Sequence, residues 1–140
     1  MLSTRVGYAG GERSDATYHD LGAHREAVEV TFDPDRISYE ELLDVFWSGQ
    51  PIDLPPDPNP RVHLAVMPRG ARQLASAEAG LARLRRERRA SIHVDVVTEP
   101  RFVAAETVHQ KFYLQRGRPT LVDELAADFP DRDAFLASTA

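Results

Sequence analysis

The stretch RVGYAGGERSDATYHDLGAHREAVEV, residues 5–30, concentrates the side chains of this chain that are best suited to chemistry. It combines a glycine pair typical of a turn with two tyrosines, two histidines and a glutamate that leads into a strand-like run. Glu26 enters that run beside His24, where a carboxyl can be partly buried and stay protonated. Such an acid can donate a proton or a hydrogen bond to a substrate oxygen. An ordinary surface carboxylate is the simpler alternative.

The rest of the chain offers weaker candidates. The histidines at positions 19, 24, 63, 93 and 109 lack a metal-site spacing such as HExxH, so we expect no metal site. The glycines near the N-terminus match neither GxGxxG nor GxxxxGK[ST], and therefore do not predict a phosphate loop. The arginines clustered within residues 83–89 are more typical of a solvated helix end than of an anion-binding patch.

Composition limits the classes of function. The 140 residues are expected to form one domain, 1–140, with 42% hydrophobic and 28% charged residues. A net charge of −5 argues against binding to nucleic acid or to an anionic membrane. No run approaches the roughly 18 apolar residues that span a bilayer, and no signal-peptide pattern opens the chain, so we expect a cytoplasmic protein. The chain has no cysteine, which excludes disulfides, thiolate zinc sites and a cysteine nucleophile within it.

One helix is predicted with particular clarity. Ser38 and Glu41 have the spacing of a capping box, in which each side chain satisfies an exposed backbone donor of the other residue. The segment that follows carries apolar residues at helical intervals, and these predict a buried face: Tyr39, Leu42, Leu43, Phe46 and Trp47.

The other elements follow from alternation, helical periodicity and turn signals. Strands are expected at 3–8, 26–33, 62–67 and 92–99. Helices are expected at 70–90, 104–115, 120–127 and 132–138, with Asp131 capping the last one. Five prolines within residues 51–61 predict an exposed, irregular loop. Strands that alternate with helices indicate a two-layer α/β or α+β domain.

Several motifs together resemble the peptide methionine sulfoxide reductase A family. GYAGG, TY and AHREAVEVTFDPDRISYEELLDVFW are similar to that family's GYxGG, xTY and GHAEAVxVxYDPxxISYExLLxxFW. ETVHQKFYLQR, residues 106–116, resembles its xxxHQKYYLQR segment, and FPDRDAFLASTA resembles the C-terminal region of one branch. The resemblance covers most of the chain and is interrupted at the proline loop.

The resemblance implies a fold and a reaction. The fold is an α/β plait, a ferredoxin-like mixed sheet with helices. The reaction is the reduction of the S epimer of methionine sulfoxide, free or in peptides, with no bound cofactor. In the family a cysteine of a GCFWG motif attacks the sulfur, while a carboxylic acid and two tyrosine hydroxyls hold and protonate the oxygen. Thioredoxin or another thiol then restores the cysteine. The chemistry is sound, because the oxygen leaves only when it is protonated or strongly hydrogen-bonded.

The resemblance also suggests roles for individual residues. Glu26 falls on the family's acid and Tyr18 on its first oxygen-binding tyrosine, so both are candidate catalytic residues. Tyr8 of GYAGG and His24, which matches the histidine of GHAE, are candidate substrate-binding residues. A family aspartate corresponds weakly to Asp57 in the rewritten proline loop.

Two parts of the family pattern are missing. Val62 stands where the second oxygen-binding tyrosine belongs. The GCFWG segment is absent together with the strand before it, the helix after it and the Phe-Trp pair of the methyl pocket. Loss of a core strand and a helix is expected to expose apolar surface, at about 2 kcal/mol for each large side chain left uncovered.

Three interpretations therefore stay open. In the first, the true start lies upstream and includes a cysteine or a selenocysteine; Met1 then stands where the family commonly has valine. In the second, the chain is a non-catalytic relative that binds a small ligand or acts as an interaction module, which the proline loop and Val62 favour. In the third, Glu26 and His24 are the acid and base of a different enzyme on the same scaffold.

Overall fold

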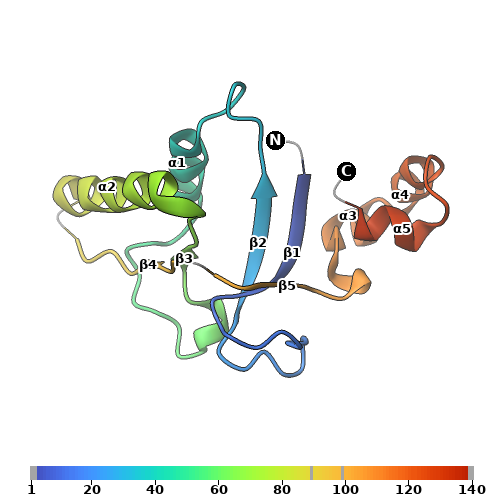
Figure 1. Cartoon of the computed structure of the whole chain (residues 1–140), viewed down its shortest axis with the longest axis horizontal. Coiled ribbons are helices and arrows are strands. Elements are labelled where there is room, and N and C mark those ends of the chain that lie inside the picture. The colour runs from blue at the N-terminus through green and yellow to red at the C-terminus, as the bar shows by residue number, and fades with distance from the viewer. Residues whose placement is uncertain (1–2, 89, 99, 139–140) are drawn as a thin grey trace.

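The computed structural model describes residues 3–88, 90–98 and 100–138, and its strands form two sheets (Figure 1). The first sheet is antiparallel in the order β2-β1-β5 and consists of β1 (Ser3–Ala9), β2 (Arg25–Thr31) and β5 (Phe102–Ala104). The second is a parallel pair of β3 (Ala65–Val66) and β4 (Asp95–Val96). The α/β class is confirmed, but the parallel and antiparallel pairings lie in separate sheets rather than in one mixed sheet.

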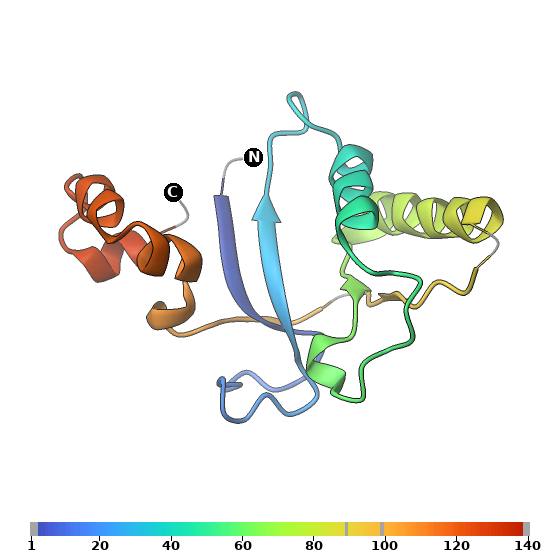
Figure 2. The ribbon, with the colours of Figure 1, turned by 180° about the vertical axis from the view of Figure 1, so that it is seen from behind.

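The helices fall into two groups on opposite sides of the β1–β2 ribbon (Figures 1 and 2). One group is α1 (Tyr39–Gly49) and α2 (Gly70–Arg88). The other is α3 (Phe112–Gly117), α4 (Pro119–Ala126) and α5 (Arg132–Ala137). Two short 3-10 turns, Pro60–Val62 and Thr107–His109, lie in the connections.

β1 is the middle strand and fixes which residues share a face. Its register places Tyr8 opposite Glu26 on β2 and opposite Val103 on β5. Because side chains alternate along a strand, these three residues point to the same side of the sheet. Gly7 allows β5 to approach closely, since a Cβ atom there would lie 2.3 Å from the carbonyl oxygen of Val103.

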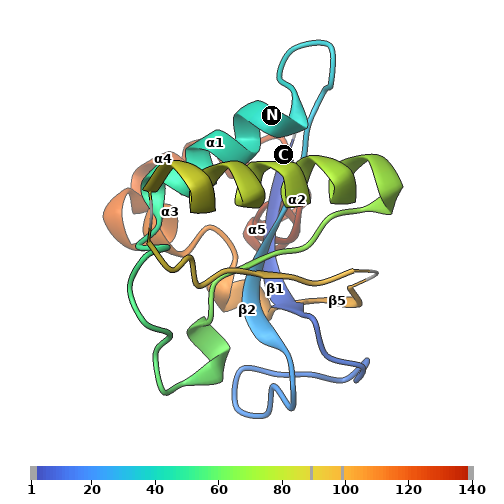
Figure 3. The ribbon, with the colours of Figure 1, turned by 90° about the vertical axis from the view of Figure 1, so that its left-hand side faces the viewer.

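The predicted capping-box helix is confirmed as α1. Ser38 Oγ accepts from the backbone N–H of Glu41 at 3.2 Å, and the Glu41 carboxylate accepts from the backbone N–H of Ser38 at 2.8 Å. The helix packs against α2 (Figure 3). Leu43 and Trp47 are buried there with three residues of α2: Ala77, Leu81 and Leu84. Burial of this face stabilises the helix far more than the cap, which contributes about 1 kcal/mol.

The C-terminal helices have a small core of their own around Val122, Phe135 and Leu136. Lys111, just before α3, connects to α5, because its Nζ donates to the carbonyl oxygens of Phe135 and Leu136, both at 3.2 Å. The same ammonium lies 5.1 Å from the centre of the Phe135 ring. The Asp131 cap predicted for α5 is confirmed, with its carboxylate accepting from the backbone N–H of Ala134 at 2.7 Å.

Two expected strands are much shorter than predicted. In the segment 62–67 only Ala65–Val66 is a strand, because Asn59 caps a 3-10 turn that Pro60 begins and Val62 ends. In the segment 92–99 only Asp95–Val96 is a strand, and Glu99 lies outside the described residues. The remaining expected strands, 3–8 and 26–33, correspond to β1 and β2 with bounds shifted by one or two residues.

The prediction of a single helix at 104–115 is wrong. Its first residue belongs to β5, which pairs with β1, and a 3-10 turn follows. Lys111 then adopts a left-handed backbone conformation with φ of 51°, which no continuous helix contains, and α3 begins at Phe112. The helices expected at 70–90, 120–127 and 132–138 correspond to α2, α4 and α5.

We expect Gly7→Ala to lower the free energy of unfolding by at least about 2 kcal/mol, because a new Cβ would push β5 away from β1. Gly49→Ala is the matched control, since no atom lies within 4 Å of the added Cβ at the end of α1. That change is expected to leave stability unchanged or to raise it by up to about 1 kcal/mol. Urea denaturation of both variants tests the pair, and equal stabilities would contradict the close β1–β5 packing.

Candidate functional site

The loop between β1 and β2 is held together by His24, which is only 2% exposed. Its Nδ1 accepts from the backbone N–H of Gly11 at 3.3 Å, and its Nε2 lies 2.9 Å from the carbonyl oxygen of Arg13. Because Nδ1 accepts, Nε2 must carry the hydrogen that it donates to Arg13, and the ring is the neutral tautomer. Both ring nitrogens are therefore used inside the loop, and neither points to a ligand.

Tyr8 is likewise buried, with 3% of its surface exposed. Its hydroxyl donates to Glu106 Oε2 at 2.5 Å. Burial raises the pKa of Tyr8 strongly, and the hydrogen bond and charge of Glu106 and then the charge of Glu26 add to the effect. The same hydrogen bond lowers the pKa of Glu106 to about 2. The pair therefore consists of a neutral phenol and an ionised carboxylate over the whole physiological range.

Tyr18 is the tyrosine that faces solvent, with 44% of its surface exposed. Its backbone N–H donates to Glu106 Oε1 at 3.1 Å, and its carbonyl oxygen accepts from the Arg61 guanidinium at 3.3 Å. Its ring stacks on His109 with 4.8 Å between the ring centres and 29° between the planes. The phenol is thus presented to solvent from a backbone that is fixed on both sides.

The sequence had led us to expect a partly buried Glu26, but its side chain is exposed. It lies on β2, the edge strand of its sheet, on the same face as Tyr8 and directly opposite it. Within the described part of the chain no hydrogen bond or ion pair engages its carboxyl group, which is therefore free to meet a ligand. Tyr18 and Glu26 thus both lie next to the hydrogen-bonded pair of buried Tyr8 and exposed Glu106.

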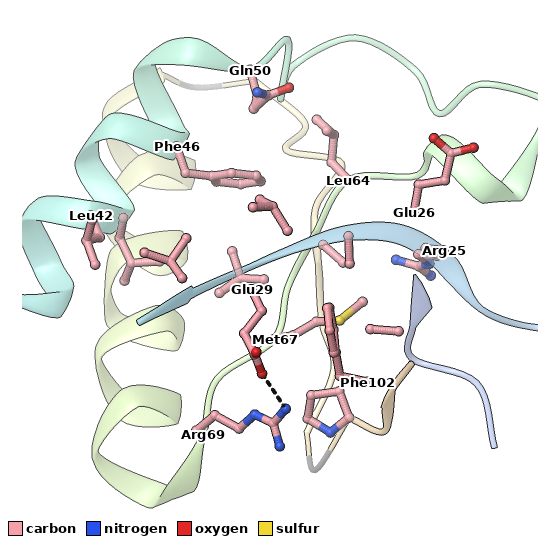
Figure 4. Close-up of a pocket in the computed structure, with 18 of the residues that line it drawn as sticks. Arg25, Glu26, Glu29, Leu42, Phe46, Gln50, Leu64, Met67, Arg69 and Phe102 are labelled. Carbon is pink, nitrogen blue, oxygen red and sulfur yellow. Dashed lines mark hydrogen bonds and ion pairs between the residues drawn. The ribbon is translucent and has the colours of Figure 1, made fainter. Parts of the chain in front are cut away.

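A cavity of about 800 Å³ separates β2 from β3 and reaches Glu26 at one end (Figure 4). Its walls are largely apolar and come from β2, α1 and residues 61–67, including Leu42, Phe46 and Leu64. Among the described residues neither the outer edge of β2 nor that of β3 has a strand partner. Val28 and Val45, which line the cavity, are 60% and 66% exposed, so the apolar exposure expected from the sequence is present.

The described ranges bring together no group of three or more histidine, aspartate or glutamate side chains that could hold a metal ion. No helix within these ranges is long and apolar enough to cross a membrane.

A family model described as peptide methionine sulfoxide reductase matches residues 1–129. The chain belongs to this family. A solved structure, methionine sulfoxide reductase A of Corynebacterium diphtheriae, has the same fold with a TM-score of 0.63 and 21% identity, over 83% of this chain and 63% of that one.

Relatives in other organisms are similar over most of this chain. Peptide methionine sulfoxide reductase A5 of Oryza sativa is 35% identical over 150 residues, which cover 100% of this chain and 56% of the relative. The peptide methionine sulfoxide reductase MsrA of Methanothermobacter thermautotrophicus is 38% identical over 80% of this chain and 72% of the relative. The fruit-fly relative is matched over 47% of its length. The chain thus spans about half the length of the rice and fruit-fly reductases.

The weakest of the reductase-family correspondences, Asp57, lies in the proline loop. Its carboxylate accepts from the backbone N–H of Asn59 at 2.7 Å, and its carbonyl oxygen lies 2.7 Å from His63 Nε2. These contacts organise the loop itself. The loop reaches the site through Arg61, which binds the backbone of Tyr18, and Val62 beside it is 48% exposed.

Glu106 is the residue of this site that our sequence analysis missed. It joins Tyr8 and Tyr18, which lie 98 and 88 positions away in the sequence. The available signal was its place as the only acidic residue of the family-like segment ETVHQKFYLQR. Helical periodicity assigned that segment to a helix over 104–115, which gave no indication of partners elsewhere in the chain.

We expect Tyr8→Phe to lower the unfolding free energy by about 1 kcal/mol at neutral pH, because one hydrogen bond to a charged acceptor is lost. The lowered pKa of Glu106 stabilises the fold at pH values above 4.5, the ordinary pKa of a glutamate. This stabilisation is lost as the pH falls towards 2. The raised pKa of Tyr8 stabilises the fold at pH values below 10.0, the ordinary pKa of a tyrosine. This stabilisation is lost as the pH rises above that value. The difference between wild type and variant is therefore largest near neutrality and shrinks at both extremes.

Urea denaturation of the two proteins across this pH range measures that difference. A gap between wild type and Tyr8→Phe that stays constant from acid to alkaline pH would contradict the pairing of a neutral phenol with an ionised carboxylate.

Proposed function

We propose that this chain supplies the oxygen-binding part of a peptide methionine sulfoxide reductase that acts on the S epimer, free or in peptides. The observation that carries the proposal is the placement of two exposed groups, the Tyr18 phenol and the Glu26 carboxyl group, beside the hydrogen-bonded pair of buried Tyr8 and exposed Glu106. The carboxyl group donates only in its protonated form. A sulfoxide oxygen is a strong acceptor, and a phenol and a carboxylic acid can both donate to it. Donation weakens the S–O bond and prepares the oxygen to leave as water.

The thiolate that attacks sulfur has to come from a polypeptide segment outside these 140 residues, because the sequence has no cysteine. We place that segment in the cavity between β2 and β3, where two strand edges are open and Glu26 lies at one end. In the reaction the thiolate forms a bond to sulfur, and the oxygen takes up two protons and leaves as water. The new S–S bond then breaks and methionine leaves with its electron pair, either when water attacks the cysteine sulfur and leaves a sulfenic acid, or when a second thiol attacks it and leaves a disulfide. Thioredoxin or another thiol then reduces the oxidised cysteine. The cytoplasmic location stays a prediction.

Binding of a substrate analogue tests the oxygen-binding part without the nucleophile. We expect N-acetyl-L-methionine (S)-sulfoxide amide to shift the NMR signals of Tyr18 and Glu26, and the R epimer to bind more weakly. Tyr18→Phe removes the hydroxyl donor and Glu26→Ala removes the carboxyl group, and each change should weaken the affinity by about fivefold.

Glu78→Ala on the exposed face of α2 is the control for these variants and should bind as wild type. Equal affinity for the two epimers, or full affinity in the Tyr18 and Glu26 variants, would remove the support for this site.

We also expect the 140-residue chain alone to form no N-acetyl-L-methionine amide from this analogue with dithiothreitol as the electron donor. The reason is chemical, because oxygen-binding groups without a nucleophile cannot form the sulfur intermediate. Chromatographic measurement of the product provides the readout. Turnover by the purified chain would show that the reaction does not depend on a thiolate from another segment.

A further inference from the structure

We propose that Glu106 is a positioning residue of the sulfoxide site, which holds the backbone of Tyr18 and is itself held by Tyr8. The inference rests on the proposed function, because it assigns a role within the same site. It extends that function to a residue that does not touch the ligand, and it reassigns Tyr8 from ligand binding to support.

The two oxygens of the Glu106 carboxylate have different partners. Oε2 accepts from the Tyr8 hydroxyl at 2.5 Å, and Oε1 accepts from the Tyr18 backbone N–H at 3.1 Å. Aspartate is one methylene shorter and cannot span both partners from the same backbone position. Glutamine has one acceptor oxygen and places an NH2 donor where the second carboxylate oxygen accepts a hydrogen bond. The position therefore requires the length and the charge of glutamate.

The segment that carries Glu106 also holds the ring of Tyr18. Glu106 is the N-cap residue of the 3-10 turn Thr107–His109, yet its side chain makes no capping bond to that turn. The carboxylate is directed to the neighbouring loop instead, while His109 at the end of the turn stacks under the Tyr18 ring. One short segment thus sets both the backbone and the ring plane of Tyr18.

The same hydrogen bond decides which groups can donate to a ligand. The Tyr8 hydroxyl hydrogen is directed at Glu106 in a buried position, so it is not available to a sulfoxide oxygen. The Tyr18 hydroxyl and the Glu26 carboxyl group remain available to a ligand. The effect of Glu106 is confined to Tyr18, because the loop has other hydrogen bonds that do not involve Glu106. His24 bonds to Gly11 and Arg13. Arg61 donates to the carbonyl oxygen of Tyr18. Loss of Glu106 should therefore release Tyr18 without unfolding the loop.

The test compares Glu106→Gln with wild type, with Tyr8→Phe and with the control Glu78→Gln. Glutamine keeps one acceptor for the Tyr8 hydroxyl but loses the second acceptor for the Tyr18 N–H. We expect Glu106→Gln to weaken binding of N-acetyl-L-methionine (S)-sulfoxide amide by about fivefold. We also expect the upfield shift that His109 imposes on the Tyr18 ring protons to diminish, while the amide signals of α1 and α2 stay in place.

A double-mutant cycle separates positioning from general destabilisation. If Tyr8 acts through Glu106, Glu106→Gln should cost less affinity in the Tyr8→Phe background than in wild type. Additive losses, or an unchanged Tyr18 ring signal in Glu106→Gln, would overturn the inference. If Glu106→Gln does not fold, Tyr8→Phe tests the inference instead, because it removes the hydrogen bond that holds Glu106. The upfield shift of the Tyr18 ring protons should then diminish in Tyr8→Phe, and an unchanged shift would overturn the inference.

The two proposals fail in distinguishable ways. If wild type does not prefer the S epimer, the proposed function is contradicted, and the Tyr18 ring signals of Glu106→Gln still judge the positioning role. If wild type prefers the S epimer and Glu106→Gln binds it equally well, only the positioning role is contradicted.

Discussion

The register of β1 is the constraint on which the rest of the site depends. A shift of one residue would turn Tyr8 to the other face of the sheet, away from both Glu26 and Glu106. Contacts along the strand fix this register. Arg5 Nε donates to Glu29 across the β1–β2 pair at 3.0 Å. The Gln110 side chain accepts from the Val6 N–H at 3.0 Å and donates to the Val6 carbonyl at 2.8 Å, as a neighbouring strand would.

This arrangement separates supporting groups from exposed ones. A buried phenol needs a hydrogen-bond partner, and Glu106 satisfies Tyr8 from the surface of the molecule. A buried imidazole has the same need, and the loop backbone satisfies His24. Among the residues that the structure describes, no hydrogen bond engages the side-chain oxygens of the two exposed groups, Tyr18 and Glu26. The sequence motif contains both kinds of residue, and only the structure tells them apart.

The parts predicted from sequence were those determined over short distances along the chain. The capping box of α1 depends on residues three positions apart, and the apolar face of the helix repeats within two turns. The strands β1 and β2 follow from alternation and lie next to each other along the chain. The motif that contains Tyr18 and Glu26 lies within this segment, so both candidates could be identified without the structure.

The parts that were not predicted depend on distant partners. Residues 104–115 have helical periodicity, but the pairing of β5 with β1 and the left-handed backbone of Lys111 outweigh it. Residues 62–67 are apolar enough for a strand, but the turn capped by Asn59 occupies their first position. Glu106 shows no local pattern at all, because both of its partners are more than 80 positions away.

In the proposed reaction, the open edge of β2 lies between the oxygen-binding groups and the segment that would carry the thiolate. An unpaired edge strand beside an apolar cavity is costly to leave exposed, and a further strand is the element that satisfies both its backbone groups and its apolar surface. A strand that pairs with β2 runs alongside Glu26, because Glu26 is part of β2. β2 would then position the incoming thiolate on one side while β1 positions Tyr8, and through Glu106 the phenol of Tyr18, on the other. The distance between the incoming thiolate and the Glu26 carboxyl group would thereby be set by strand spacing, whereas Tyr18 is positioned by the β1–β2 loop and by Glu106.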